Sequence, residues 1–369
     1  MTPKEPARNA EYTKIMNRRH ILRLLRRAPM SRIELAAQTG LTRAAITMIT
    51  REMIDEGLLR ECEASAKPGK GKHPIPLTVE PSAFIAAGVA LTRSGCTVGI
   101  TDLSGQLLAR RSLAISPPDG LVMLRDTLQE LINETGTTPL GIGISAPGPL
   151  DAAHGIILNP PYFEAWHNTA AASYLTSALH LPAYLEKDAS ALALWHLDKG
   201  GSRDFLLLLV DSGIGSGIVS DGRLFTSSGR FTSELGHTTI RYDGKPCGCG
   251  NRGCLEAYAS IPNLLAESSS RYTTWKDVID ADDTALIERE AEYLSAGITT
   301  IRNLVNIDTV YLAGDIRCGF DRLAPRLMHR VMAQSMIRSP IDIQPADEIA
   351  DIGVAAAANL VFSAHLSME

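Results

Sequence analysis

The residues best suited to chemistry lie between positions 233 and 256. Here Glu234-Leu-Gly-His237 is followed by Cys247-Gly-Cys249-Gly-Asn-Arg-Gly-Cys254-Leu-Glu256. One imidazole and three thiolates make up a closed set of four ligands of the kind that structural zinc prefers. The spacing of the first two cysteines is too short for chelation from a relaxed strand, so the three glycines are needed to turn the chain around an ion. The sequence therefore predicts a structural Zn²⁺ ion bound by His237, Cys247, Cys249 and Cys254.

The alternative for this cluster is three reduced cysteines in a glycine-rich turn. The first ten residues are polar and charged and lack the apolar core of a signal peptide. Without an export signal, clustered cysteines favour metal ligation over disulfides. The longest apolar run, Phe205–Val210, is about a third of the length that a membrane span needs. We therefore expect a cytoplasmic protein with no membrane partner.

Charge is distributed unevenly along the 369 residues. Residues 1–80 carry 15 basic and 9 acidic side chains, a net charge of +6, whereas the other 289 residues carry 21 basic and 32 acidic ones, a net charge of −11. A basic head on an acidic body indicates a polyanionic partner for the head alone. The length allows two or three domains, and we expect a DNA-binding domain over 1–80 and a second domain over 81–369.

The basic head has the pattern of a helix-turn-helix. Ser31-Arg-Ile-Glu34 is a capping box that opens a short helix ending at Thr39-Gly40, and Thr42 is a suitable N-cap for the next helix, from Arg43 to about Glu56. Residues 58–61 and 75–79 predict a β-hairpin wing with a basic, glycine-rich tip. The alternative is a three-helix packing module with a solvated basic face.

The helix from Arg43 to about Glu56 is the expected recognition helix. Its polar face and the wing tip supply the residues that we expect to contact DNA, with the wing lysines meeting phosphates. These residues are Ser31, Arg32, Thr42, Arg43, Ala44, Thr47, Arg51, Lys67, Lys70 and Lys72.

From about residue 84 the pattern changes to strands that alternate with helices. Three short strands over 84–91, 96–102 and 107–113 precede a helix over 120–135, a buried strand over 140–144, a strand over 183–186, a helix over 189–199 and a strand over 205–210. This order predicts an α/β fold with an actin-like, ribonuclease-H-like lobe. Two such lobes usually bind a ligand in the cleft between them.

The Glu-x-Gly-His and Cys-x-Cys-Gly-x-x-Gly-Cys-x-Glu segments resemble the signature of the ROK family (repressors, open reading frames and sugar kinases). The segment Ser31-Arg-x-Glu-Leu-Ala-x-x-Thr-Gly-Leu-Thr42 is similar to the winged helix of the family's sugar-responsive repressors. The resemblance covers nearly the whole chain. It implies a winged helix-turn-helix followed by a two-lobed ROK domain, whose C-terminal helix returns to the first lobe.

The resemblance also implies a set of sugar-binding residues. Carboxylates and an imidazole suit a sugar because each can accept a hydrogen bond from a hydroxyl group. Asp188 stands where the family's kinases keep the base that deprotonates the sugar. The implied contacts are Glu234, His237, Glu256, Asp188, Lys187, Asn159 and Gly148.

Departures from the kinase pattern favour a sensor over an enzyme. The kinase segment Asp-x-Gly-Gly-Thr reads Ala90-Leu-Thr92-Arg-Ser here, so a methyl group replaces the carboxylate near magnesium and a side chain crowds the phosphates. The late triple-glycine turn reads Ala313-Gly-Asp315, although the loop 211–217 survives. We therefore expect no enzyme, with Asp188 as a relic of the base or a plain hydroxyl acceptor.

Lys187 replaces the asparagine that precedes this aspartate in the kinases. It is expected either to pair with Asp188 and hold it ionised, to contact the phosphate of a phosphosugar, or to point to solvent. The sequence thus predicts a repressor of carbohydrate genes that binds operator DNA as a homodimer or homotetramer and is released by a sugar or phosphosugar. Two alternatives stay open: a sugar kinase or bifunctional kinase-regulator that uses Asp188, and a zinc-organised protein-interaction module.

Overall fold

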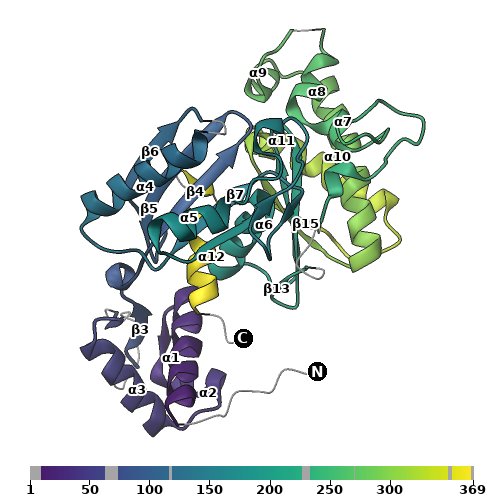
Figure 1. Ribbon diagram of the computed structural model, residues 1–369. Helices are drawn as coiled ribbons and strands as arrows, with labels where there is room; N and C mark the ends of the chain where they lie inside the picture. The colour runs from purple at the N-terminus through teal and green to yellow at the C-terminus, as the bar shows by residue number, and fades with distance from the viewer. Residues whose placement is uncertain are drawn as a thin grey trace, which may run out of the picture.

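The structure is a computed structural model that describes residues 10–62, 74–115, 119–226, 233–269, 271–347 and 351–366. It has an N-terminal helical part and a larger body of two lobes, each built around a five-stranded sheet (Figure 1).

The N-terminal part is a winged helix-turn-helix, as predicted. It consists of α1 (Ala10–Arg27), β1 (Met30–Ser31), α2 (Arg32–Thr39), α3 (Arg43–Asp55), β2 (Leu59–Glu61) and β3 (Pro76–Val79). The capping box forms at α2, where Ser31 Oγ accepts from the Glu34 amide and Glu34 accepts in return from the Ser31 amide. Gly40 ends α2 in the left-handed region at φ 72°, and Thr42 caps α3. Strands β2 and β3 pair antiparallel as the expected wing, whose tip lies outside the described residues.

The first lobe contains a mixed sheet in the order β10-β7-β4-β5-β6. Three antiparallel strands form a meander, and two parallel strands extend it, with α4 and α5 packed on the sheet. The elements of this lobe are η1 (Pro81–Ala83), β4 (Ile85–Thr92), β5 (Gly95–Asp102), β6 (Leu107–Leu113), α4 (Gly120–Thr135), β7 (Ile142–Ala146), β8 (Leu150–Asp151), β9 (Ile156–Ile157), η2 (Glu164–Trp166), α5 (Ala171–Leu179) and β10 (Ala183–Lys187).

The second lobe repeats this plan with the sheet order β13-β12-β11-β14-β15. Its largest hydrophobic core lies between the sheet and α8 to α11. The elements are α6 (Asp188–Asp198), β11 (Phe205–Val210), β12 (Ile214–Ser220), β13 (Arg223–Leu224), η3 (Leu235–His237), α7 (Glu256–Ala259), α8 (Ile261–Ala266), α9 (Trp275–Asp280), α10 (Thr284–Val305), β14 (Thr309–Ala313), η4 (Asp315–Arg317), α11 (Phe320–Gln334) and β15 (Asp342–Pro345).

Helix α12 (Ile352–His365) joins the three parts of the molecule. Its small residues lie directly on β4 and β7, where Gly88 and Gly143 are register partners. A β-carbon at Gly143 would stand 1.7 Å from the Ala357 carbonyl oxygen, so only glycine permits this approach. The other end of α12 reaches α1 (Figure 1, yellow against purple). In the part of the chain that is described, no helix is long and apolar enough to cross a membrane.

Candidate metal centre, interlobe cleft and nucleic-acid interface

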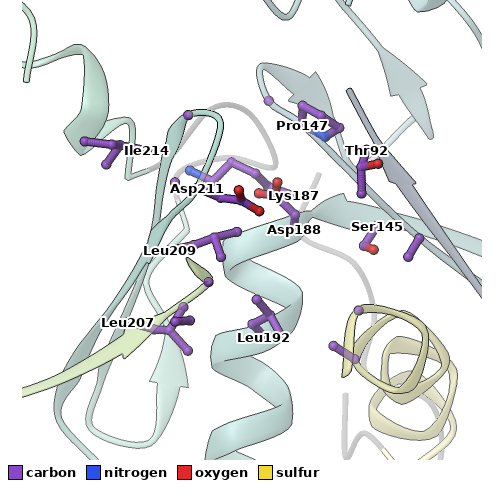
Figure 2. A pocket seen from close by; sticks show the side chains of 18 of the residues that line it. Thr92, Ser145, Pro147, Lys187, Asp188, Leu192, Leu207, Leu209, Asp211 and Ile214 are labelled. Atoms are coloured by element: carbon purple, nitrogen blue, oxygen red, sulfur yellow. The ribbon is translucent and has the colours of Figure 1, made fainter. Parts of the chain in front are cut away.

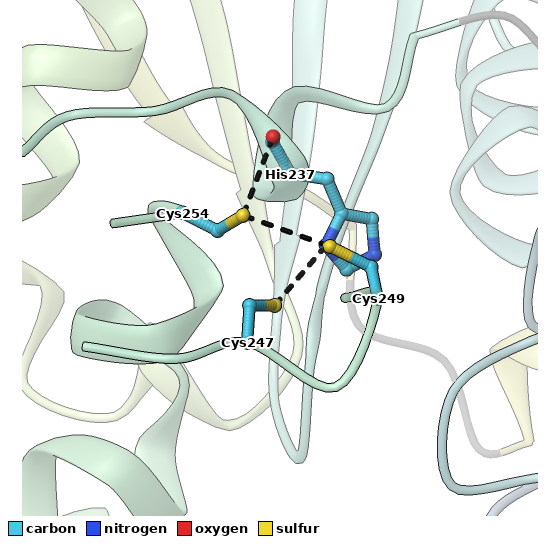
Figure 3. A group of neighbouring side chains, drawn as sticks. All are labelled: His237, Cys247, Cys249 and Cys254. Atoms are coloured by element: carbon cyan, nitrogen blue, oxygen red, sulfur yellow. Dashed lines mark hydrogen bonds between the residues drawn. The ribbon is translucent and has the colours of Figure 1, made fainter. Parts of the chain in front are cut away.

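His237, Cys247, Cys249 and Cys254 meet at one point (Figure 3). Their candidate ligand atoms all lie within 4.8 Å of one another. Cys247 Sγ is 3.6 Å from His237 Nδ1, and Cys249 Sγ is 3.7 Å from Cys254 Sγ. A tetrahedron with Zn–S bonds of about 2.3 Å has edges of about 3.8 Å. The four side chains therefore form a cluster of the right size and ligand chemistry for such an ion.

Local backbone geometry explains how the eight-residue segment from Cys247 to Cys254 reaches this arrangement. Gly253 has φ 72°, and a β-carbon there would stand 1.6 Å from the Arg241 carbonyl oxygen. Gly250 has φ 90°, also in the region that favours glycine. Burial raises the pKa of the Cys254 thiol to about 12 in the metal-free chain. A metal ion would therefore displace a tightly held proton on binding.

A cavity of about 290 Å³ lies between the two lobes (Figure 2). Thr92 and Ser145 line it from the first lobe, Leu207 and Leu209 from β11 of the second, and Ile352 from the start of α12. Asp188 projects into it as the first residue of α6. The lining thus combines apolar side chains with a group of charged ones.

Burial raises the pKa of Asp188 to about 6, and the nearby Glu234 carboxylate adds to the effect. The Ala189 amide donates to Asp188 Oδ1 at 2.7 Å and, like the Lys187 ammonium, opposes this shift. The sequence argument that Lys187 would hold Asp188 ionised thus underestimated desolvation. Asp211, in the same cavity, also has a raised pKa, because of burial and the neighbouring Asp315.

Lys187 does not point to solvent. Its side chain is 6% exposed, and Nζ donates to the Ser233 carbonyl oxygen at 2.8 Å and to Glu234 Oε1 at 3.4 Å. Strand β10, which carries Lys187, belongs to the first lobe, whereas Glu234 precedes η3 in the second. This ion pair therefore connects the lobes across the cavity.

The structure brings most of the sugar-binding residues implied by the resemblance to one place. Gly148, Lys187, Asp188, Glu234, His237 and Glu256 all line the main cavity. Asn159 lies in an adjoining hollow that shares Glu234 and His237 with it. Glu256 is buried, and its Oε2 accepts from the Ile214 amide at 2.8 Å.

Arg93 is a cleft residue that the sequence reasoning passed over. Its guanidinium lies 3.8 Å from Glu256 Oε1 and 5.6 Å from the centre of the Tyr162 ring. A β-carbon at Gly213 would be 2.3 Å from Arg93 Nη1, so the guanidinium lies on the loop after β11. The sequence did hold a signal for Arg93. This residue stands at the second glycine of the kinase segment Asp-x-Gly-Gly-Thr, directly after Thr92. Glu164 and His167, in the adjoining hollow, were also missed.

The exposed face of α3 carries the expected recognition residues. Arg43, Ala44, Thr47 and Arg51 are exposed and border a shallow hollow together with Met48. Thr42 is exposed as the N-cap.

The other residues expected to contact DNA are placed differently. Ser31 is buried and its hydroxyl is occupied by the capping box. Arg32 bonds Glu61 at 3.0 Å and Thr50 at 3.2 Å. Lys67, Lys70 and Lys72 lie outside the described residues.

Comparison with known protein families assigns both parts of the chain. Residues 86–364 match the ROK family, and residues 17–60 match a winged helix-turn-helix DNA-binding family. The chain belongs to the ROK family. The predicted α/β architecture, with a winged helix-turn-helix before an actin-like ROK domain, is confirmed.

Similar proteins in this family include named transcriptional regulators. The chain is 29% identical to the DNA-binding transcriptional dual regulator NagC of Escherichia coli, with 91% of this chain and 90% of that one covered. It is 27% identical to the xylose repressor of Caldicellulosiruptor bescii, over 77% and 78%.

One solved structure aligns with nearly the whole chain, whereas another aligns with about three quarters of it. A ROK family transcriptional regulator, described as a homologue of the E. coli MLC protein, aligns over 96% of this chain and 97% of its own with a TM-score of 0.79 and 25% identity. The ROK hexokinase from Thermus thermophilus aligns over 74% of this chain and 97% of its own, with a TM-score of 0.63 and 25% identity.

Proposed function

We propose that this protein is a sugar-responsive transcriptional regulator that represses carbohydrate uptake or catabolism genes. The observation that carries the proposal is the combination, in one chain, of the exposed α3 face and a polar interlobe cleft. The alignment with NagC over 91% of the chain supports it, because that match includes both parts.

The effector is a sugar or phosphosugar held in the cleft. Asp188, Glu234 and Glu256 supply carboxylates there, and Asn159 and His237 supply an amide and an imidazole. Lys187 and Gly148 complete the set. A population shift follows if the sugar favours the state that does not bind operator DNA, and each tenfold change in affinity corresponds to about 1.4 kcal/mol.

The metal is Zn²⁺ in a structural role. Three thiols and one imidazole nitrogen leave no open coordination position for catalysis. His237 belongs both to this cluster and to the lining of the cleft. The ion would thereby hold the segment between Glu234 and Glu256 in the shape that the cleft needs.

The protein acts without catalysis. Ala90 stands in the cleft lining where a kinase has its metal-binding carboxylate, and the Arg93 guanidinium lies against the Gly213 loop. Phosphoryl transfer depends on placed metal ions and phosphate-binding groups. The Ala90 methyl group cannot hold a metal ion, and the Arg93 side chain occupies space beside the Gly213 loop.

DNA binding involves the winged helices of two subunits. Such modules usually read two half-sites, so we assign a homodimer, or a homotetramer built from two dimers. The working division is a DNA-binding domain over 1–80 and a ROK domain over 81–369. Operator binding places the protein in the cytoplasm.

A sugar kinase is the second candidate. The body aligns with the T. thermophilus ROK hexokinase, and Asp188 has a pKa near that of a useful general base. A kinase would turn over ATP with a sugar and lose this activity in Asp188→Ala. A sensor would lose only sugar affinity.

The test is fluorescence anisotropy with a labelled DNA fragment from upstream of the protein's own gene. Competitor DNA and salt are held fixed, because salt alone changes such affinities strongly. D-glucose, D-xylose, N-acetyl-D-glucosamine and their phosphates are added one at a time. Specific binding that one compound releases supports the proposal. No specific binding, together with ATP turnover on the same panel, would establish the kinase instead.

A further inference from the structure

Two helices that line the cleft also reach the winged helix. Helix α6 begins in the cleft with Asp188 and ends at Asp198, about 15 Å away at 1.5 Å per residue. Helix α12 lines the cleft with Ile352 and Ala356 and presents Asn359 and Phe362 further along. Both helices therefore span from the cavity to α1.

Arg26, near the end of α1, lies where these helices meet. Its side chain is 6% exposed, and its Nη1 donates to Asp198 Oδ2 at 3.3 Å. Its Nη2 donates to Asn359 Oδ1, and its guanidinium lies 5.2 Å from the centre of the Phe362 ring. One side chain of the winged helix thus binds α6 and α12 together.

The carboxylate of Asp198 is also held from the side of α12. Asn359 Nδ2 donates to Asp198 Oδ2 at 3.1 Å, and Ser363 Oγ donates to the same oxygen at 2.8 Å. The next residue, Lys199, donates to the Ser104 carbonyl oxygen at 2.6 Å in the turn between β5 and β6. The far end of α6 is therefore fixed to three elements.

Hydrophobic side chains from both the winged helix and α12 pack around Arg26, Asp198 and Asn359. One hydrophobic core combines Leu22 and Leu25 of α1 with Val361 and Phe362 of α12. A buried ion pair inside such a contact is sensitive to small shifts, because a displaced partner leaves a charge without compensation. Packed elements of this kind switch between discrete arrangements rather than deform continuously.

We propose that Arg26, Asp198 and Asn359 are positioning residues that couple the cleft to the orientation of the DNA-binding domain. A ligand at Asp188 that moves the start of α6 relative to α12 moves Asp198 relative to Asn359. Arg26 then cannot keep its hydrogen bonds to both Asp198 and Asn359. Helix α1 therefore changes its position relative to α6 and α12. This inference rests on the proposed function for its ligand, but the coupling itself is testable without one.

The ligand-free test is hydrogen–deuterium exchange on the full chain. Asp198→Asn keeps the side-chain shape and removes the charge that Arg26 faces. We expect amides of the last turns of α1 and amides of residues 187–191, at the cleft end of α6, both to exchange about threefold faster or more. Glu288→Gln is the matched control, since Glu288 pairs with Arg330 at 2.6 Å on the second lobe, and it should leave both segments unchanged.

A merely structural ion pair would speed exchange in α1 alone. Wild-type exchange at residues 187–191 in Asp198→Asn would therefore overturn the proposal. If this variant does not fold, Ser363→Ala removes one bond to the same carboxylate and gives the same readout. Arg26→Lys retains the charge and should remain closer to wild type than Arg26→Met.

The second measurement uses whichever compound of the panel releases DNA from the wild-type protein. Asp198→Asn should bind that compound within about threefold of wild type, while the ratio of DNA affinities without and with it falls by about tenfold. An unchanged ratio would overturn the coupling. If no compound releases DNA, the proposed function fails, and the exchange experiment still decides the coupling.

Discussion

Lys187 in the first lobe pairs with Glu234 in the second, with Nζ and Oε1 3.4 Å apart. Arg93 and Glu256 repeat this relationship at 3.8 Å, again with the cation from the first lobe and the carboxylate from the second. Two ion pairs therefore bridge the lobes on the walls of the same cavity. A ligand whose hydroxyl groups bind these carboxylates would compete with the bridges, which relates occupancy of the cleft to the positions of the lobes.

Replacing Asp188 should change stability in a pH-dependent way. Its folded-state pKa of about 6 lies above the ordinary value of 3.8, so the folded state binds this proton more tightly and the stability contributed by Asp188 is lost as pH rises through 6. The full shift corresponds to about 3 kcal/mol. Because the half-buried side chain faces a cleft where water screens its charge, we expect Asp188→Asn to be more stable than wild type by about 1 kcal/mol at pH 7.5.

Urea unfolding at pH 4 and pH 7.5 measures this effect. The advantage of Asp188→Asn should disappear at pH 4, and an equal gain at both values would contradict the assignment. Asp277→Asn is a control of opposite sign. Hydrogen bonds from Thr274 and Thr273 lower the pKa of Asp277 to about 2, so its contribution is present at neutral pH and its replacement should destabilise the protein there.

Removal of one thiol should abolish metal binding. Cys254 is fully buried and lies within the cluster, so Cys254→Ser leaves three ligands and a polar group at the center of the loop. We expect about one zinc per chain in the wild type by plasma mass spectrometry and almost none in the variant, with a lower melting temperature. Cys62→Ser, far from the cluster in sequence and without a place in it, should keep the metal. A full zinc content in Cys254→Ser would exclude the cluster as the site.

Replacing Arg43 or Arg51 of α3 by alanine should weaken DNA binding, through loss of either a base contact or a phosphate contact. Arg43 and Arg51 are exposed on the same face, so replacement by alanine should leave the melting temperature unchanged. An arginine that reads a base contributes about 1–3 kcal/mol, whereas one that meets a phosphate also lowers the slope of binding against salt by about one unit. Anisotropy titrations over a series of salt concentrations separate these cases.

The control for this series is Arg203→Ala, an exposed arginine of the body that pairs with Asp221. It should bind DNA as the wild type does. Arg32→Ala should instead lower stability, because Arg32 bonds Glu61 and Thr50 within the domain. Wild-type DNA affinity in both Arg43→Ala and Arg51→Ala would show that α3 is not the recognition helix.

Local sequence signals predicted much of the fold. The helix over Gly120–Thr135 and the strand over Phe205–Val210 have the predicted bounds, because a glycine C-cap ends the first and an unbroken apolar run defines the second. The capping box at Ser31 was predictable for the same reason. The buried strand expected over 140–144 is β7, shifted to Ile142–Ala146, because pairing with β4 and β10 decides its bounds.

Some residues of the candidate site could also be predicted from local sequence, and others could not. The four candidate metal ligands were found because three of them lie within eight residues and glycines turn the chain between them. Arg93 was missed because its partners Glu256 and Tyr162 come from distant segments. The environment of Lys187 was left open because only the tertiary fold brings Glu234 beside it. Spacing along the chain thus predicts local clusters, whereas contacts between lobes depend on how the two sheets meet.

The contact between α12 and the first sheet should tolerate no side chain at Gly143. An added methyl group would lie 1.7 Å from the Ala357 carbonyl oxygen, so Gly143→Ala must push α12 away from β7. Overpacking of this kind costs about 1–3 kcal/mol. Since α12 also carries Asn359 and Phe362, which contact Arg26, we expect a lower melting temperature together with faster hydrogen exchange in α1.

Gly120→Ala is the matched control for this change. Gly120 is the first residue of α4, and a β-carbon added there would lie 3.4 Å from the Trp166 ring, an ordinary contact distance. Alanine is also the better helix former. Its melting temperature should equal or exceed that of the wild type. If Gly143→Ala has the melting temperature of the wild type, then α12 can move away from β7 at little cost. In that case close packing against Gly88 and Gly143 does not hold α12 between the sheet and the DNA-binding domain.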